Sequence, residues 1–225
     1  MLQDDIILIA DPKILAIPTI DNQDAMLDLI KQKEIMYGPS PEIPNNTDYT
    51  KLRKTVYEKL KQAQALLPAG LRFCLYEGYR SLQLQKMLFD NRLQQVQMQY
   101  PDWNQAQIFT EATKIIAPVS NQDGSKNIPP HSTGGAVDVY LVNDKGDAID
   151  MGIHPKDWIH DVDGSISFTS SQKISAEAKK NRSVMSDVLA AVGFVNYPTE
   201  YWHWSYGDRY WAYHKHEAHA IYASV

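Results

Sequence analysis

The spacing of hydrophobic residues divides the chain into an irregular N-terminal part and a more regular remainder. Residues 1–47 contain five prolines, which leave room for only one short helix, near 21–33. We therefore expect a wrapping N-terminal arm over 1–47. From Asp48 onward, hydrophobic residues recur at steps of three and four, which predicts a helix ending at Pro68 and Gly70. The residues on its apolar face are Tyr49, Leu52, Val56, Leu60, Ala63 and Leu67.

The middle of the chain alternates between short apolar runs and longer helical patterns. The run LRFCLYEGYR, residues 71–80, predicts a buried strand that ends at Gly78 and places Arg80 just beyond it. Segments rich in Gln, Leu, Met and Ala, without internal breakers, predict helices over about 81–99 and 104–116. Residues 135–143 predict a second strand, which turns at 143–146 and continues into a short partner at 147–152.

The C-terminal third predicts one helix and an aromatic β segment. The helix covers Ser175 to Val192 and ends at Gly193, with Lys179, Lys180 and Arg182 on the solvent side. Residues 193–213 are too aromatic and β-prone for a helix, and 214–225 form a polar tail. We see no repeat or linker, so these elements predict a single α+β domain over 1–225.

Composition limits the classes of function. The chain has 225 residues, is 44% hydrophobic and has a net charge of −5. It lacks both a membrane-length apolar run and a basic block, so we expect no membrane and no nucleic acid as partners. The sole cysteine, Cys74, lies in an apolar run typical of a buried structural thiol. The acidic N-terminus does not resemble a secretion signal, so we expect a cytoplasmic protein, or a periplasmic one from which a leader is missing.

The first candidate site lies in PPHSTGGAVDVYL, residues 129–141. Seven extended residues span roughly 23 Å, so His131 and Asp138 can meet only if the chain folds back at Gly134 and Gly135. In the strand, Asp138 shares a face with Ala136 and Tyr140, opposite the apolar Val137, Val139 and Leu141. A buried aspartate needs a partner. Three interpretations stay open: an ion pair with Arg80 or another cation, a hydrogen-bonded structural carboxylate, and a metal ligand.

The second candidate is EYWHW, residues 200–204. Strict strand alternation would place Glu200 and His203 on opposite faces, so Glu200 must lie in a turn or bulge if both serve one site. The simpler interpretation of this fragment is a core histidine and a surface glutamate. Taken together, His131, Asp138 and His203 form a three-ligand set that leaves one zinc position open. Glu200 could then transfer protons, and Arg80 could stabilise developing negative charge.

These residues carry a resemblance to the M15 metallopeptidases. His131 and Asp138 resemble the family's His-x6-Asp motif, Glu200 and His203 its Glu-x-x-His motif, and EGYR is similar to the Gly-Tyr-Arg of the D-alanyl-D-alanine dipeptidases. The order of the motifs also agrees, from about residue 50 to 213. The resemblance implies the hedgehog-like and D-Ala-D-Ala peptidase-like α+β fold, in which a central antiparallel sheet is flanked by helices.

The resemblance also implies a mechanism and a substrate. One zinc ion is held by His131, Asp138 and His203, Glu200 is the general base and then acid, and Arg80 stabilises the oxyanion. The substrate implied is the cell-wall dipeptide D-Ala-D-Ala. Its ammonium group is expected at Asp157, which follows Met151 and Gly152 one residue later than in the family. Tyr79 and Trp202 complete the predicted substrate contacts. Pro129 stands where the family usually has Ser or Thr.

Several alternatives remain. A D,D-carboxypeptidase on longer peptides and a non-catalytic zinc-stabilised binding module would share the fold, and a homodimer is left open. A non-haem iron oxygenase also uses two histidines and a carboxylate, but its usual His-x-Asp spacing is missing. His214, His216 and His219 are spaced incorrectly for a His-Glu-x-x-His site, which favours a solvated tail. His154 and His160 are expected at the surface or at the rim of a pocket.

Overall fold

A five-stranded sheet organises the protein. The computed structural model describes residues 6–41, 43–161 and 163–225, and its main sheet has the strand order β2-β4-β5-β7-β6. The strands are β2 (Met36–Tyr37), β4 (Leu71–Glu77), β5 (Ala136–Asn143), β7 (His203–Ser205) and β6 (Val195–Asn196). All neighbouring pairs are antiparallel except β2 and β4, which are parallel. The predicted α+β class with a mainly antiparallel central sheet is confirmed.

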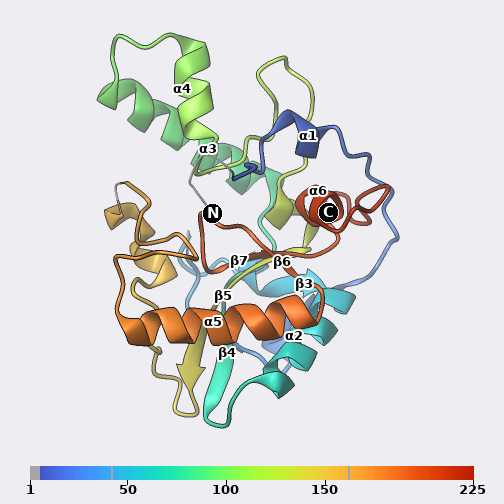
Figure 1. Cartoon of the computed structure of the whole chain (residues 1–225). Helices are drawn as coiled ribbons and strands as arrows, with labels where there is room; N and C mark the ends of the chain where they lie inside the picture. Colours follow the sequence, from blue (N-terminus) through green and yellow to red (C-terminus); the bar gives the residue numbers. More distant parts are fainter. Residues whose placement is uncertain (1–5, 42, 162) are drawn as a thin grey trace.

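Two helices cover one face of this sheet. Figure 1 shows α2 (Lys54–Leu66) and α5 (Ala176–Ala191) lying together across the strands. Their apolar residues pack on Val137, Val139 and Leu141 of β5, which all point into the main core. Alternation along the strand therefore places Asp138 and Tyr140 on the other face, as predicted.

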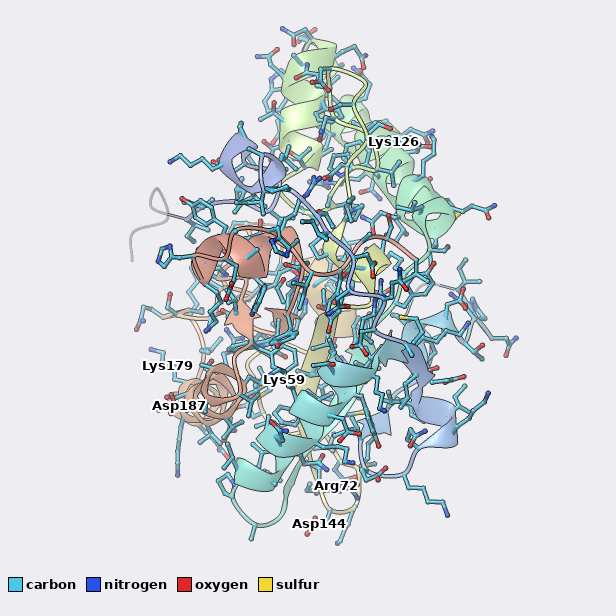
Figure 2. The ribbon with its side chains drawn as sticks, turned by 90° about the vertical axis from the view of Figure 1, so that its right-hand side faces the viewer. Lys59, Arg72, Lys126, Asp144, Lys179 and Asp187 are labelled. Atoms are coloured by element: carbon cyan, nitrogen blue, oxygen red, sulfur yellow. The ribbon has the colours of Figure 1, made fainter. Side chains whose placement is uncertain are left out.

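A helical hairpin stands at the opposite end of the molecule from α2 and α5. It consists of α3 (Leu82–Gln99) and α4 (Gln105–Ala112), and it has a small core of its own around Phe89, Val96 and Ile108. In Figure 2, Lys126 marks this end, whereas Arg72 and Asp144 mark the far end, where β4 begins and β5 ends. The hairpin forms one side of the cavity described below.

The remaining elements belong to the N-terminal region, the loops and the C-terminus. A two-stranded antiparallel sheet joins β1 (Met26–Asp28) to β3 (Lys51–Arg53). The short helices are α1 (Pro12–Leu15), α6 (Arg209–His214) and four 3-10 segments. These segments are η2 (Leu29–Lys31), η3 (Asp48–Thr50), η4 (Pro130–Thr133) and η5 (Pro155–His160).

Several predicted boundaries were wrong because tertiary pairing overrides local pattern. The helix expected from Asp48 begins at Lys54, and the preceding residues form η3 and then β3. The helix expected near 21–33 is instead β1 followed by η2. In the aromatic C-terminal segment, Asp208 caps an unexpected helix, α6, by accepting a hydrogen bond from Trp211 N at 2.8 Å.

The predicted solvent exposure of Arg182 was also wrong. Arg182 on α5 is buried rather than solvated, and it donates hydrogen bonds to Met151 O at 2.7 Å and Phe168 O at 2.6 Å. In the tail, residues 214–218 are exposed as predicted, whereas Ala220 and Tyr222 further along are buried. Arg182 and Tyr222 thus tie a loop and the chain end to the core.

Candidate active site

Adjacent strands bring the second histidine and the aspartate together. Asp138 of β5 lies directly opposite His203 of β7 in the antiparallel register. Directly opposite residues on neighbouring strands have side chains within contact distance. His203 Nδ1 lies 3.0 Å from Asp138 Oδ1, and both residues are buried. Asp138 is therefore paired with histidine, and the proposed ion pair with Arg80 is not formed.

A glycine turn brings the first histidine to the same place. His131 lies in η4, which ends at Gly134 with a φ of +71°, and a Cβ on Gly135 would lie only 2.4 Å from Tyr206 O. These glycines fold the chain back as predicted. His131 Nε2 lies 3.2 Å from His203 Nδ1 and 3.4 Å from Asp138 Oδ1.

The three converging atoms fit a divalent metal. Donors on a tetrahedral zinc at about 2.0–2.1 Å are separated by about 3.3 Å, close to the distances between His131 Nε2, His203 Nδ1 and Asp138 Oδ1. His131 Nδ1 lies 2.8 Å from Gly78 O, which can only accept, so the proton belongs on Nδ1 and Nε2 is free as a ligand. Among the described residues this is the group of three that can hold a metal.

Electrostatics in the cluster agree with a site for a cation. Burial alone would raise the pKa of Asp138, but His131 and then His203 outweigh it and hold that pKa below its usual range. For His131, burial opposes the charged form, whereas Asp138 favours it, and the net pKa is raised. An ionised carboxylate that faces two imidazoles thus attracts positive charge to a buried position.

Glu200 lies beside this cluster, in the turn before β7, as the alternation argument required. Its backbone N–H bonds to Tyr197 O at 2.9 Å, and His203 N bonds to Glu200 O at 3.1 Å. Burial raises the pKa of the Glu200 carboxyl to about 7, in spite of the opposing charge of His203. A carboxyl group with this pKa can both take up and release a proton near neutral pH.

Arg80 is held rigidly at the same cavity. Its guanidinium forms a bidentate ion pair with Glu77, with an Nε to Oε1 distance of 2.8 Å, and Nη1 donates to Gln85 Oε1 at 3.0 Å. Glu77 itself is buried at the end of β4, where the register with β5 is irregular. This arrangement fixes the direction of a permanent positive charge.

All of these groups face one cavity of about 620 Å³. Its walls come from the sheet, from the α3–α4 hairpin, from the loop around 155–168 and from the N-terminal residues 6–9. The polar residues near the cluster are Glu77, Arg80, Gln85, His131, Asp138, Glu200 and His203.

Comparison with known proteins agrees with this geometry. The model of peptidase family M15, described as D-ala-D-ala dipeptidase, matches residues 45–221. The chain belongs to the M15 peptidase family. It is therefore a hydrolase of the peptidase class. It is 25% identical to a D-alanyl-D-alanine dipeptidase from Synechocystis sp., over 91% of each chain.

Two solved structures are also similar to this M15 peptidase. VanYB in complex with D-alanine-D-alanine is 15% identical, with a TM-score of 0.42 and coverage of 91% of this chain and 93% of that one. A vancomycin-resistance D,D-pentapeptidase VanY in complex with Zn(II) is 18% identical, with a TM-score of 0.34 and coverage of 83% and 92%.

The residues predicted to contact substrate are spread over the M15 peptidase. Trp202 lines the main cavity. Tyr79 does not line it, and its hydroxyl donates to Val225 O at 3.1 Å. Asp157 lines a separate cavity of about 340 Å³ that also includes His154, whereas its neighbour Trp158 lines the main one.

Sequence reasoning missed several carboxylates at the cavity, of which Glu77 and Asp161 are buried. Glu77 pairs with Arg80, and a charged residue inside the apolar run LRFCLYE was the signal that could have revealed it. Asp161 lines the cavity from the loop and accepts hydrogen bonds from Ser167 N at 2.6 Å and Ile166 N at 3.0 Å. No local pattern distinguishes Asp161 from Asp157.

The other candidate features have structural explanations. Cys74 is buried and free. The tail residues His214, His216 and His219 belong to no potential metal cluster among the described residues. Within the described ranges, no helix is both long and apolar enough to span a bilayer.

Proposed function

We propose that this M15 peptidase hydrolyses the peptide bond of free D-Ala-D-Ala in a zinc-dependent reaction. The observation that carries the proposal is the convergence of His131, Asp138 and His203 beside a carboxyl group, Glu200, whose pKa is raised to about 7. A purely structural zinc site usually has four protein ligands and needs no proton-transfer group. Three donors with an adjacent carboxyl group favour catalysis over a binding module.

His131, Asp138 and His203 would hold the zinc ion. The buried carboxylate and the two imidazoles are a common zinc donor set, and their position at the cavity leaves one side open to substrate. Bound zinc supplies Lewis acidity for activating water and polarising a carbonyl group.

Glu200 is proposed as the general base and then the general acid. It would accept a proton from the attacking water and deliver it to the nitrogen of the leaving D-alanine. A group whose pKa lies near the working pH does both steps efficiently. Its position in the turn, rather than on the strand, allows it to face the same cavity as His203.

Arg80 is proposed to stabilise the oxygen that gains negative charge as the carbonyl carbon becomes tetrahedral. Glu77 and Gln85 hold the guanidinium in place before substrate arrives, so little reorganisation is needed during the reaction. Because Arg80 stays charged at any working pH, this contribution does not titrate.

The free ammonium group of the substrate needs a carboxylate. The resemblance indicates Asp157, but Asp161 is a buried loop carboxylate that lines the cavity with Glu200, whereas Asp163, which also lines it, pairs with Lys173. Trp202 supplies an apolar surface close to both the zinc ligands and Glu200. We therefore regard Asp161 as a competitor of Asp157 for the ammonium contact.

Free and N-blocked dipeptides test the proposal. Purified protein loaded with zinc should cleave D-Ala-D-Ala and leave N-acetyl-D-Ala-D-Ala largely intact, as measured by release of D-alanine together with metal analysis. Glu200→Ala should abolish turnover while zinc stays bound. Loss of zinc in that variant would make Glu200 a ligand, and failure to cleave any D,D-peptide would contradict the proposal.

The cavity volume favours one second candidate, a D,D-carboxypeptidase. A cavity of about 620 Å³ lies in the ~300–1,000 Å³ range of pockets that hold drug-sized ligands. The volume of this cavity is larger than a free dipeptide needs. Equal rates on free and N-acetylated substrate would favour this alternative.

A further inference from the structure

Among the described residues at the cavity, Arg92 is a cation without a carboxylate partner of its own. Arg80 pairs with Glu77, and Lys114 pairs with Glu111 at 2.7 Å. Arg92, the remaining Lys or Arg among the cavity-lining residues, takes part in none of the ion pairs found across the described residues. Its Nη1 donates to Gln95 Oε1 at 3.5 Å, the outer limit for a hydrogen bond.

Arg92 also occupies an unusual position on its helix. Gln85, Phe89 and Val96 are buried on the inner side of α3, whereas Arg92, which lies between Phe89 and Val96 at steps of three and four, is half-buried. Arg92 therefore lies along the side of the helix that carries Phe89 and Val96, which belong to the hairpin core. The Nε atom of Arg92 is buried and has no hydrogen-bond partner in the part of the chain that the structure describes. A buried guanidinium N–H without an acceptor is costly.

The position of Arg92 suits one end of a short peptide. Seven residues separate it from Gln85, which corresponds to about 10 Å along a helix, and Gln85 contacts Arg80. Arg80, Gln85 and Arg92 all line the same cavity. An extended dipeptide is about 7 Å long, which lets a substrate near Arg80 extend a terminal group toward Arg92.

We propose that Arg92 binds the free C-terminal carboxylate of the peptide substrate and so determines specificity for a free carboxyl end. The proposal rests on the peptide-hydrolase function proposed above. A guanidinium group binds a carboxylate through two parallel N–H donors, which would provide the acceptor that Arg92 Nε lacks. Arg92 acts in binding and takes no part in the bond-breaking step.

Equilibrium binding tests this role without requiring turnover. D-Ala-D-Ala and its C-terminal amide, D-alanyl-D-alaninamide, are titrated into zinc-loaded Glu200→Gln protein and into the same protein carrying Arg92→Met. Methionine keeps the apolar stem of the side chain and removes the charge. The first protein should prefer the carboxylate by about 10- to 100-fold, and the second should bind both ligands about equally.

Kinetics in the otherwise native enzyme give the complementary result. Arg92→Met should raise the KM for D-Ala-D-Ala by about 10- to 100-fold with kcat nearly unchanged, and Arg92→Lys should restore part of the affinity. The matched control is Lys86→Gln, which removes a charge from the solvent side of the same helix, where Lys86 pairs with Asp90. The control should leave KM unchanged.

Two outcomes would overturn the role of Arg92. One is an unchanged preference for carboxylate over amide in the Arg92→Met protein, and the other is weak, equal binding of both ligands when Arg92 is present. Failure of the hydrolase proposal has a different signature, because the wild-type protein would then cleave no D,D-peptide whatever the binding measurements show.

Discussion

The cavity has one wall built on strands and another built on a loop, and the two position their side chains by different means. On the strand wall, β5 and β7 are hydrogen-bonded in a fixed register, so Asp138 and His203 are opposite each other. If the pairing register of β5 shifted by one residue, Asp138 would point into the core, where the apolar Val137 and Val139 now pack. Local sequence therefore determines which side chains point to the cluster of His131, Asp138 and His203.

The loop wall has no such periodic constraint. The segment from Met151 to Phe168 is held at its ends by Arg182, which donates to the carbonyl groups of both residues, and internally by Asp161. Within it, Asp157 and Trp158 are sequence neighbours but line different cavities. Which loop carboxylate lines the main cavity depends on the length and path of this loop, and no pattern along the chain records it.

Substitution on the strand wall should have the largest effect. We expect Asp138→Ala to lose bound zinc and to reduce hydrolysis by about 1000-fold or more, because several kcal/mol of Lewis-acid stabilisation are removed. Metal content and D-alanine release measure both effects. Asp144→Asn, at the far end of the molecule in Figure 2, is a matched surface control. Full zinc occupancy in Asp138→Ala would rule out a ligand role for Asp138.

Substitutions on the loop wall should have an intermediate effect and should separate the two carboxylates. Asp161→Asn keeps an oxygen that can accept from Ser167 N but removes the charge. We expect it to raise the KM for free D-Ala-D-Ala by about 10-fold or more and to retain zinc. Asp157→Asn should change KM much less. The opposite ranking, measured with the same assay, would restore Asp157 as the ammonium partner.

The smallest expected effect is on the free energy of unfolding of the metal-free protein. Its pH dependence tests whether burial perturbs Glu200. Its pKa of about 7 lies above the usual 4.5, so between these values the native state binds more protons than the unfolded state. The free energy of unfolding contributed by Glu200 therefore falls as pH rises through this window. Glu200→Gln lacks this group and should gain stability relative to wild type between pH 5 and pH 8.

Urea unfolding of both metal-free proteins at several pH values measures this difference. His131 is present in both proteins, so the comparison removes its shared contribution: its pKa is raised from the usual 6.5, so it also lowers stability as pH rises, but only above that value. A difference between the two proteins that does not change with pH would show that Glu200 is not perturbed by burial.

The sequence predicted the secondary structure and side-chain positions of some parts of the molecule better than those of others. The strands at 71–77 and 136–143 and the helices α3 and α5 were predicted within a few residues, because their hydrophobic periodicity is local. The start of α2 was wrong because Lys51–Arg53 pairs with Met26–Asp28, more than twenty residues earlier in the chain. Arg182 was placed in solvent because nothing near it in sequence shows that Met151 O and Phe168 O need donors.

The sequence by itself determined which side chains could hold a metal, because two glycines allow the chain to turn back after His131 and alternation along β5 places Asp138 away from the core. Tertiary structure alone decided that His203 lies opposite Asp138, that Glu77 holds Arg80, and that Asp161 and Arg92 face the cavity. Those contacts join segments far apart in the chain, and their distances depend on how the sheet, the hairpin and the loop pack together.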